Sequence, residues 1–465
     1  MNLPAVHKND MLAICALLAL IGLAISVAGK LGPGNPFSIF FSLWLCITVG
    51  LMVARGTFSP ASPYIWQLLA SMLCVYLAFA VAARRGNRCP PASVEMDYRI
   101  YCLAWAQWAV LAVVPLLYLK ATQLAGGSIL SRTGYIALRT ALIEEGAGGY
   151  GLLAYFVPLA FVVASIRLVQ FVATRKGLLD LIISVGSATA MAFLCTGRTF
   201  FLMMFCFLAF PLISTGKLRL RGAVILGVML LASFIVVALL TRKGLDHHAS
   251  LTANVESILR MLKVYVLSPT MAMAVVADGN PEPLALGGYS LRFFQILLTK
   301  LTGIEFESPP LIRDYVHVPD RINVFTVMDP YFRDFGAAGV VGFAVASAAL
   351  HFSLFRLMRH RGGPWIFIYS ATLFPLVMQF FQDMYATLLS TWVQVFFWYM
   401  LFVRFSATKT VNAPIPPAGS LPGVRHRIGP APRARRAGRR DVQPRSPIPA
   451  HPASTAAAGG RGSAR

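Results

Sequence analysis

Long apolar stretches recur along almost the whole chain, and they limit its fold more than any other feature. Each is about as long as a helix needs, at about 1.5 Å per residue, to cross a hydrocarbon layer of about 30 Å. Hydrophobic residues make up 57% of the 465 residues and charged residues 13%, which is more apolar surface than one soluble core can hide. The period-two alternation of transmembrane strands is missing. We therefore predict an all-α, polytopic integral membrane protein.

We expect about eleven transmembrane helices. Ten or twelve remain open, because the first pair of stretches and the junction at Thr196–Arg198 can be divided differently. The first stretch lacks a signal-peptide cleavage site and is followed by further spans, so we expect it to be retained. The expected spans are Met11–Ala28, Phe37–Ala54, Ile65–Ala83, Ile100–Leu119, Leu152–Leu168, Leu178–Cys195, Thr199–Ser214, Gly222–Leu240, Gly336–Phe355, Trp365–Phe381 and Ala386–Val403.

Short basic clusters between the spans indicate the orientation. The clusters within 84–88, 175–176, 217–221 and 356–361 fall on one side if the spans alternate, and basic loops mark the cytoplasmic side. The other side then holds a smaller outer loop and a large one. This arrangement places the N-terminus outside and the C-terminus in the cytoplasm. The two outer loops are 120–151 and 241–335.

The segment 405–465 differs in composition from residues 1–404. It carries eleven Lys and Arg against a single Asp, together with ten Pro, which predicts a disordered basic tail and not a folded module. Much of the net charge of +23 therefore lies in this tail, where it faces anionic lipid headgroups on the cytoplasmic side. We expect contact with membrane lipid and no nucleic-acid partner.

Polar residues gather at the outer ends of the spans, whereas the span centres are nearly free of charge. A transporter needs charged groups or broken helices near mid-membrane, so the pattern favours an enzyme that acts on a lipid-anchored substrate over a flippase or exporter. Arginine is the commonest charged residue expected on the outward side of the membrane. Its forked guanidinium matches phosphate oxygens, which predicts a diphosphate ligand. The outer arginines are Arg132, Arg139, Arg198, Arg242, Arg260, Arg292, Arg313, Arg321 and Arg333.

Arg198 differs from the other arginines because it lies in a tight turn between two apolar spans. A charge held in or near the membrane is costly and indicates a functional site. Interfacial anchoring is the simpler interpretation of Arg139, which shares a predicted helix face with Tyr135. No spacing of His, Cys, Asp or Glu is typical of a metal site, so we predict neither a metal nor a cofactor.

The stretch 323–343 changes from polar to apolar halfway along. Asp334 is expected at the N-terminus of the ninth span, where free N–H groups and the helix dipole favour a carboxylate, so a plain helix cap is one interpretation. Asp329 and Tyr331 precede it around Pro330. A carboxylate beside arginines also suits glycosyl transfer, since it can accept the proton of a sugar hydroxyl while cations stabilise a departing diphosphate. Asp334 is the first candidate for this role and Asp329 the second.

Three stretches of the chain carry a joint pattern: CTGRTFFLMMFCFL (195–208), PLALGGYSLRFF (283–294) and NVFTVMDPYFRDFGAAGVVG (323–342). The most specific part is an N-x-x-T-(x)-Y-x-x-D-F-G pattern, formed by Asn323, Thr326, Tyr331, Asp334, Phe335 and Gly336. Together these stretches resemble the oligosaccharide repeat-unit polymerases, the Wzy or O-antigen polymerase family. The similarity runs with gaps from about Lys120 to Asp383.

The resemblance implies a GT-C-like glycosyltransferase of the bacterial inner membrane with a periplasmic site. Such enzymes polymerise undecaprenyl-diphosphate-linked glycan without a nucleotide sugar, and their partners are a flippase and a chain-length regulator. By this similarity Arg198 contacts the diphosphate, and Tyr331 and Asp334 belong to the site. Arg139, Arg242, Arg292 and Arg313 are implied as further substrate-binding arginines, and Asn323 and Thr326 of the pattern are implied as substrate-binding residues. An O-antigen ligase, which transfers the same kind of glycan to another lipid acceptor, is the nearest alternative.

Overall fold

The computed structural model divides the chain into two units, Met1–Thr408 and Lys409–Arg465. All described residues lie in the first unit, so the expected disorder of the tail 405–465 concerns residues outside them. The structure describes residues 8–32, 34–54, 56–58, 62–85, 100–143, 149–218, 221–222, 225, 228–229, 251–279, 287–306, 309 and 313–403.

Helices make up nearly all of the regular structure in this part of the chain, and the one hairpin has two residues in each strand. The helices before the large loop are α1 (Lys8–Ala28), α2 (Pro36–Val53), α3 (Pro63–Arg85), α4 (Ile100–Ala125), α5 (Arg132–Ile143), the 3-10 helix η1 (Gly151–Tyr155), α6 (Phe156–Thr174), α7 (Leu178–Leu194) and α8 (Arg198–Ser214). The later elements are α10 (Leu251–Gly279), α11 (Arg292–Thr302), β1 (Val316–His317), β2 (Arg321–Ile322), α12 (Met328–Arg361), α13 (Pro364–Val377), the 3-10 helix η2 (Met378–Phe380) and α14 (Leu389–Phe402).

Six of these helices are long and apolar enough to cross a membrane, which agrees with an all-α membrane protein. They are Asp10–Ala28, Pro36–Val53, Pro63–Arg85, Tyr101–Ala125, Gly151–Thr174 and Met328–Arg361, and α7, α8, α13 and α14 are shorter apolar helices. The expected span Gly222–Leu240 lies largely outside the described residues. The count of eleven spans therefore stays a prediction.

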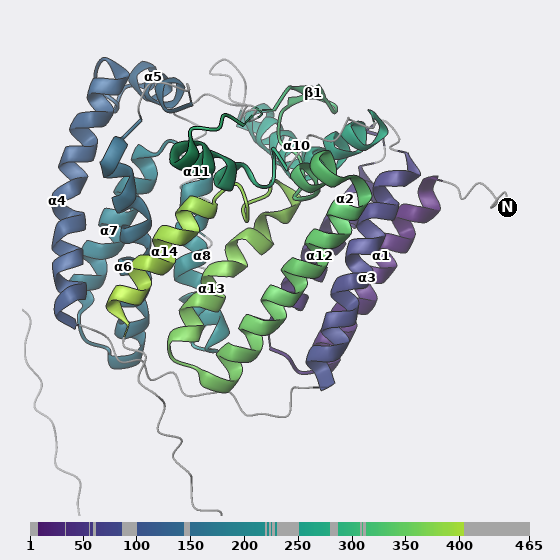
Figure 1. Cartoon of the computed structure of the whole chain (residues 1–465), viewed down its shortest axis with the longest axis horizontal. Coiled ribbons are helices and arrows are strands. Elements are labelled where there is room, and N and C mark those ends of the chain that lie inside the picture. The colour runs from purple at the N-terminus through teal and green to yellow at the C-terminus, as the bar shows by residue number, and fades with distance from the viewer. Residues whose placement is uncertain are drawn as a thin grey trace, which may run out of the picture. The chain divides into compact units, whose positions relative to one another are not determined.

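Local sequence explains how the membrane helices begin and pack. At α2 the side chain of Asn35 accepts hydrogen bonds from the N–H groups of Phe37 and Ser38, and Pro36 fills the first helical position, where its missing N–H costs nothing. Within the first unit, α3 packs between α1 and α12, and α13 packs against both α12 and α8. Figure 1 shows α12 and α13 between the N-terminal helices and the group α4, α6, α7 and α8.

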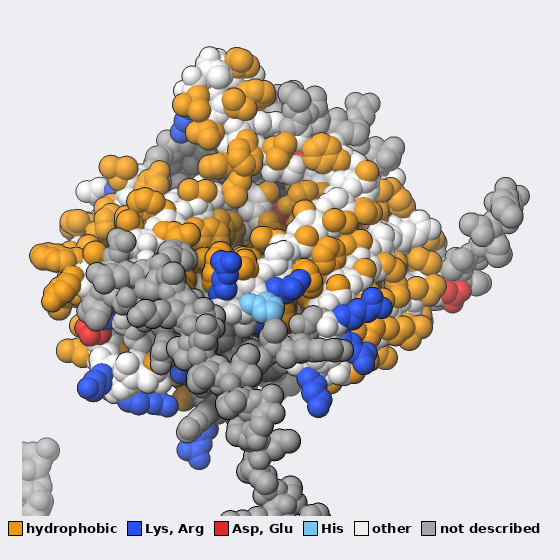
Figure 2. Space-filling view, turned by 60° about the horizontal axis from the view of Figure 1, so that its bottom comes forward, with side chains coloured by type: hydrophobic (Ala, Val, Ile, Leu, Met, Phe, Trp, Pro, Cys, Tyr) orange, Lys and Arg blue, Asp and Glu red, His pale blue; other side chains and the backbone are white. Residues whose placement is uncertain are grey.

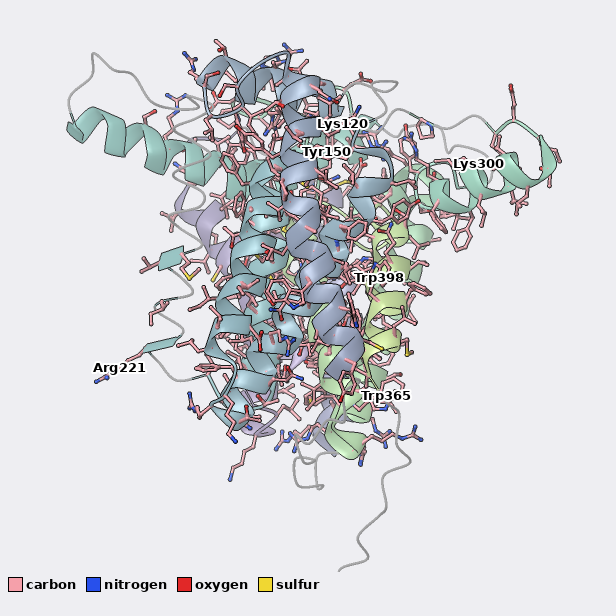
Figure 3. All side chains as sticks on the ribbon, turned by 90° about the vertical axis from the view of Figure 1, so that its left-hand side faces the viewer. Lys120, Tyr150, Arg221, Lys300, Trp365 and Trp398 are labelled. Atoms are coloured by element: carbon pink, nitrogen blue, oxygen red, sulfur yellow. The ribbon has the colours of Figure 1, made fainter. Side chains whose placement is uncertain are left out.

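The two ends of the helices differ in charge. Lys and Arg side chains gather at the lower end in Figure 2, while hydrophobic side chains cover the sides of the helices. We call this the basic end; α3 and α12 finish there with Arg84, Arg85, Arg359 and Arg361, and Arg221 lies there in Figure 3. The opposite end, which we call the loop end, carries α5, α11 and β1 (Figure 1). The asymmetry agrees with the expected placing of the outer loops away from the basic clusters.

Helix α12 is broken near its start. Gly336 has a φ of 61° and a ψ of −149°, so the helix consists of a short segment, 328–335, and a long one, 337–361. Only glycine adopts this backbone conformation readily. The long segment begins where the ninth span was expected, and the short segment carries the polar motif residues at the loop end.

Candidate functional site

A cavity of about 490 Å³ opens at the loop end. Its wall comes from three successive stretches and a fourth that is distant in sequence. The three are the first half of α11 with the turn before it, the segment before the hairpin, and the start of α12 with the segment leading into it. The fourth is the connection from η2 to α14 with the first turn of α14. The lining residues are Tyr289, Arg292, Phe293, Ile296, Pro309, Arg313, Asn323, Val324, Phe325, Thr326, Asp329, Pro330, Gln382, Asp383, Ala386, Thr387 and Ser390. Five residues chosen from the sequence thus share one wall: Arg292, Arg313, Asn323, Thr326 and Asp329.

Asp329 is the anionic centre of this wall. Its Oδ2 lies 3.2 Å from Nε of Arg313 and its Oδ1 lies 2.6 Å from Nε of Arg333, which is one helical turn further along α12. The carboxylate is 5% exposed and the two arginine side chains are about one fifth exposed, so little water screens these ion pairs. Burial lowers the pKa of Arg313, and the charge of Asp329 opposes that change; a guanidinium stays protonated.

The ring of Tyr289 supports the same two guanidinium groups. Cζ of Arg313 lies 3.9 Å from the ring centroid, and Cζ of Arg333 lies 5.5 Å from it, within the range of cation–π attraction. Arg292, at the first position of α11, donates from Nη1 to the carbonyl oxygen of Pro309 at 2.5 Å. The backbone and the aromatic ring therefore fix where the arginines of the wall stand.

The carboxylate of Asp334 binds the turn before α11. Its two carboxylate oxygens accept hydrogen bonds from the N–H of Tyr289 (3.1 Å) and from both the N–H and the hydroxyl of Ser290 (2.7 Å each). The side chain is buried and is not among the residues of the cavity wall. Instead of capping its own helix, Asp334 ties α12 to the turn before α11, and so positions Tyr289 and Arg292.

Tyr331 contacts a second carboxylate, that of Asp383, which is not among the residues predicted from the sequence. Its hydroxyl donates to Oδ1 of Asp383 at 3.4 Å, and its ring stacks on Phe343 with centroids 4.3 Å apart. Tyr331 is likewise not a wall residue. The only sequence signal for Asp383 is its place in the polar run QDMYAT between the last two expected spans.

Asp383 lies on the wall in the connection to α14. It accepts hydrogen bonds from the N–H groups of Tyr385 (2.9 Å), Ala386 and Thr387 (3.1 Å each), and from the Thr387 hydroxyl (3.3 Å). Burial raises the pKa of Asp383, and these hydrogen bonds partly offset the effect. With its oxygens so occupied, Asp383 fixes the shape of the connection.

Thr326 is a neutral residue of the wall whose hydroxyl group makes no hydrogen bond to the described residues. Its side chain is fully buried. The adjacent Val327 N–H donates to the carbonyl oxygen of Gln379 at 2.8 Å, which fixes the segment against η2. A buried hydroxyl normally finds a partner, so Thr326 is a polar group of the wall whose hydrogen bond is left unmade.

Arg139, another of the predicted arginines, is not brought to this wall. Arg139 of α5 donates to the carbonyl oxygen of Thr196 at 3.3 Å, and Tyr150 donates to that of Leu194 at 2.6 Å. Both therefore hold the turn between α7 and α8, where Thr196 has a φ of 55°. Arg198 begins α8, but its side chain and all of Arg242 lie outside the described residues.

The wall combines guanidinium groups, carboxylates and neutral polar groups. Such a set can bind a dianion through forked hydrogen bonds and can hold hydroxyl groups nearby. Among the described residues, no group of three or more His, Cys, Asp or Glu is placed to hold a metal ion. Comparison with protein-family models, with curated proteins and with solved structures finds no match for this chain.

Proposed function

We propose that the chain is a membrane glycosyltransferase that polymerises undecaprenyl-diphosphate-linked repeat units into a surface polysaccharide. The observation that carries the proposal is the cavity wall on which Arg292 and Arg313 stand beside Asp329, Asn323 and Thr326. A polyprenyl diphosphate is a dianion attached to a lipid, and such a site at the end of apolar helices suits both of its parts.

In this proposal the arginines contribute most to the reaction. As the acceptor hydroxyl forms its bond to the anomeric carbon, it loses its proton to water, the bond from that carbon to the diphosphate oxygen breaks, and the diphosphate departs with the electron pair. Arg292 and Arg313 stabilise the charge that develops there. Asp329 has an arginine on each of its two oxygens, so it holds the arginines in place and orients the acceptor. Asn323 and Thr326 bind sugar hydroxyl groups.

The proposal includes the arrangement expected from the sequence. The chain crosses the bacterial inner membrane about eleven times in a GT-C-like fold, with the loop 241–335 in the periplasm and the tail 405–465 in the cytoplasm. Arg198 is a further diphosphate contact, with Arg139 acting through the turn before it. A flippase that delivers repeat units and a chain-length regulator are its partners.

The test compares arginine variants in a strain from which the chain has been deleted. Arg313→Gln and Arg292→Gln should each abolish the polysaccharide ladder while the protein remains in the membrane, and Arg313→Lys should restore little because it lacks the fork. Arg321→Gln is the matched control, since Arg321 is exposed and its guanidinium lies over Tyr315 outside the cavity wall.

A full ladder from the Arg292 and Arg313 variants would exclude the proposed role of the cavity. The deletion strain itself separates polymerase from ligase. Loss of a polymerase leaves single capped repeat units, whereas loss of a ligase leaves polymer on its lipid carrier.

A further inference from the structure

Helix α11 has two faces with different surroundings. Arg292, Phe293 and Ile296 contribute to the cavity wall. At about 100° per residue, the opposite side of the helix presents Phe294, Leu297, Leu298 and Leu301, which form the face that we call the outer face. These four side chains are 44 to 74% exposed. An outer face made of four large apolar residues in an eleven-residue helix is too concentrated to be scattered surface hydrophobicity.

The position of α11 explains what this face meets. Figure 1 shows α11 across the loop end, directly above the start of α14, and residues of both elements share the cavity wall. In Figure 3, turned by 90°, the helix that carries Lys300 extends sideways beyond the upright helices at their upper end. Six helices in the described part of the chain are able to span a bilayer, so a helix lying across their ends stands at the boundary between headgroups and acyl chains.

The neighbouring surface is apolar as well. Val393, Phe397 and Met400 of α14 are exposed, as expected of a helix that faces lipid. Lys300 of α11 is exposed near the end of the helix, where its stem can reach along the apolar surface while the ammonium group meets phosphate. An apolar face with an adjacent lysine, at the level where the bilayer ends, fits a lipid surface better than a protein partner.

We infer that α11 is an interfacial helix whose outer face inserts into the outer leaflet of the bilayer. The helix then separates the cavity from the lipid: its arginine face belongs to the site and its apolar face to the membrane. If the proposed function holds, the lipid-linked donor reaches Arg292 by passing along α11, with its polyprenyl chain on the outer face and its diphosphate in the cavity.

The insertion is tested on the full chain in vesicles of phosphatidylcholine. Single cysteines carrying an environment-sensitive fluorophore are placed at Leu297, Leu301 and Lys300, in a background whose seven native cysteines are replaced by alanine. Doxyl-labelled phosphatidylcholine should quench the fluorophore at Leu297 and Leu301 several-fold more than at Lys300, and aqueous iodide should show the reverse order. Lys300 is the matched control because it lies on the same helix and outside the outer face.

Equal iodide quenching at all three positions would show that α11 lies in water and would overturn the inference. Disulfide-linked dimers formed efficiently through Leu301→Cys would also overturn it, by showing that a second copy covers the face. Because quenching is read in the resting protein, it does not depend on glycosyl transfer. The donor path has its own measurement: Leu297→Asp with Leu301→Asp should raise KM for the lipid-linked donor several-fold with kcat retained, and an unchanged KM would refute that path.

Discussion

Asp329 is a buried carboxylate that holds two arginines in place through ion pairs. Both of its oxygens are occupied, by Arg313 and Arg333, and Arg292 adds a third guanidinium to the same region. On the cavity wall, Arg292 and Arg313 are matched in number by two carboxyl groups, Asp329 and Asp383. The site can therefore receive an anion through forked hydrogen bonds from the guanidinium groups, and not through an excess of positive charge.

Replacement of Asp329 by Asn should destabilise the protein as well as inactivate it. The change leaves Arg313 and Arg333 partly buried without their counter-charge, and removal of one partner of a buried ion pair typically costs about 3 to 5 kcal/mol. The free energy of unfolding, from a denaturant titration in mixed micelles, measures the effect. Asp329→Glu keeps the negative charge and should lose less of the free energy of unfolding. Equal stability of the Asn variant and the wild type would show that the ion pairs contribute little.

The residues of the wall could be predicted only in part. Asn323, Thr326 and Asp329 lie within one short polar stretch at the end of an apolar span, and their closeness in sequence keeps them together in space. Asp383 is distant in sequence from this stretch and carries no motif, so only the packing of α12 against α13 reveals that it belongs there. Asp334 is a catalytic candidate from the sequence because it precedes an expected helix. The sequence does not show that the turn before α11 donates hydrogen bonds to its carboxylate.

At the scale of the element, the break in α12 depends on Gly336. Its backbone conformation is one that side chains with a Cβ rarely adopt, and a Cβ there would meet no other atom within 4 Å. Any cost of Gly336→Ala is therefore conformational. We expect the free energy of unfolding to fall by about 1 to 3 kcal/mol. The other outcome is that α12 straightens, which pulls Asp329 away from Arg313 and lowers the polymer yield.

Gly342 provides the matched control for this substitution in the same helix. It also has open space around its Cβ position, and its φ is an ordinary negative one. Gly342→Ala should therefore stabilise the helix by about 0.5 to 1 kcal/mol. The temperature of thermal unfolding should fall for Gly336→Ala and rise for Gly342→Ala, and only Gly336→Ala should lower the polymer yield. A fall in unfolding temperature for both variants would contradict the conformational explanation.

The connection from η2 to α14 should make stability depend on pH through Asp383. Because the pKa of this carboxyl group is raised in the folded protein, the folded state retains the proton over a range in which the unfolded chain has lost it. The stability contributed by Asp383 is therefore full below about pH 4 and falls as the pH rises through the folded pKa. Asp383→Asn should lack this decline. A stability difference between wild type and variant that stays constant from pH 4 to 7 would contradict it.

For the whole molecule, apolar length predicted where most helices lie but not how the loops return to them. Lengths and hydropathies place the spans at α1 to α4, α6 and α12, because a membrane helix must be long and apolar whatever its neighbours are. Helices α5, α10 and α11 lie in the expected outer loops, where amphipathic sequence allows either a surface position or a cavity wall. The cavity arises from contacts between these loops and the helix ends, and no local pattern specifies such contacts.

The asymmetry of the two ends leads to a prediction for the entire fold. Basic residues concentrate at the end where α3 and α12 finish, and positive charge is retained in the cytoplasm during insertion. The cavity, at the other end, should therefore face outward. A cysteine in place of Asp314, which is exposed near the hairpin, should react with a membrane-impermeant maleimide added to intact spheroplasts. A cysteine in place of Lys176, exposed between α6 and α7, should react only after permeabilisation. The opposite pattern would put the arginine cavity on the cytoplasmic side, where it could not receive a substrate presented from the periplasm.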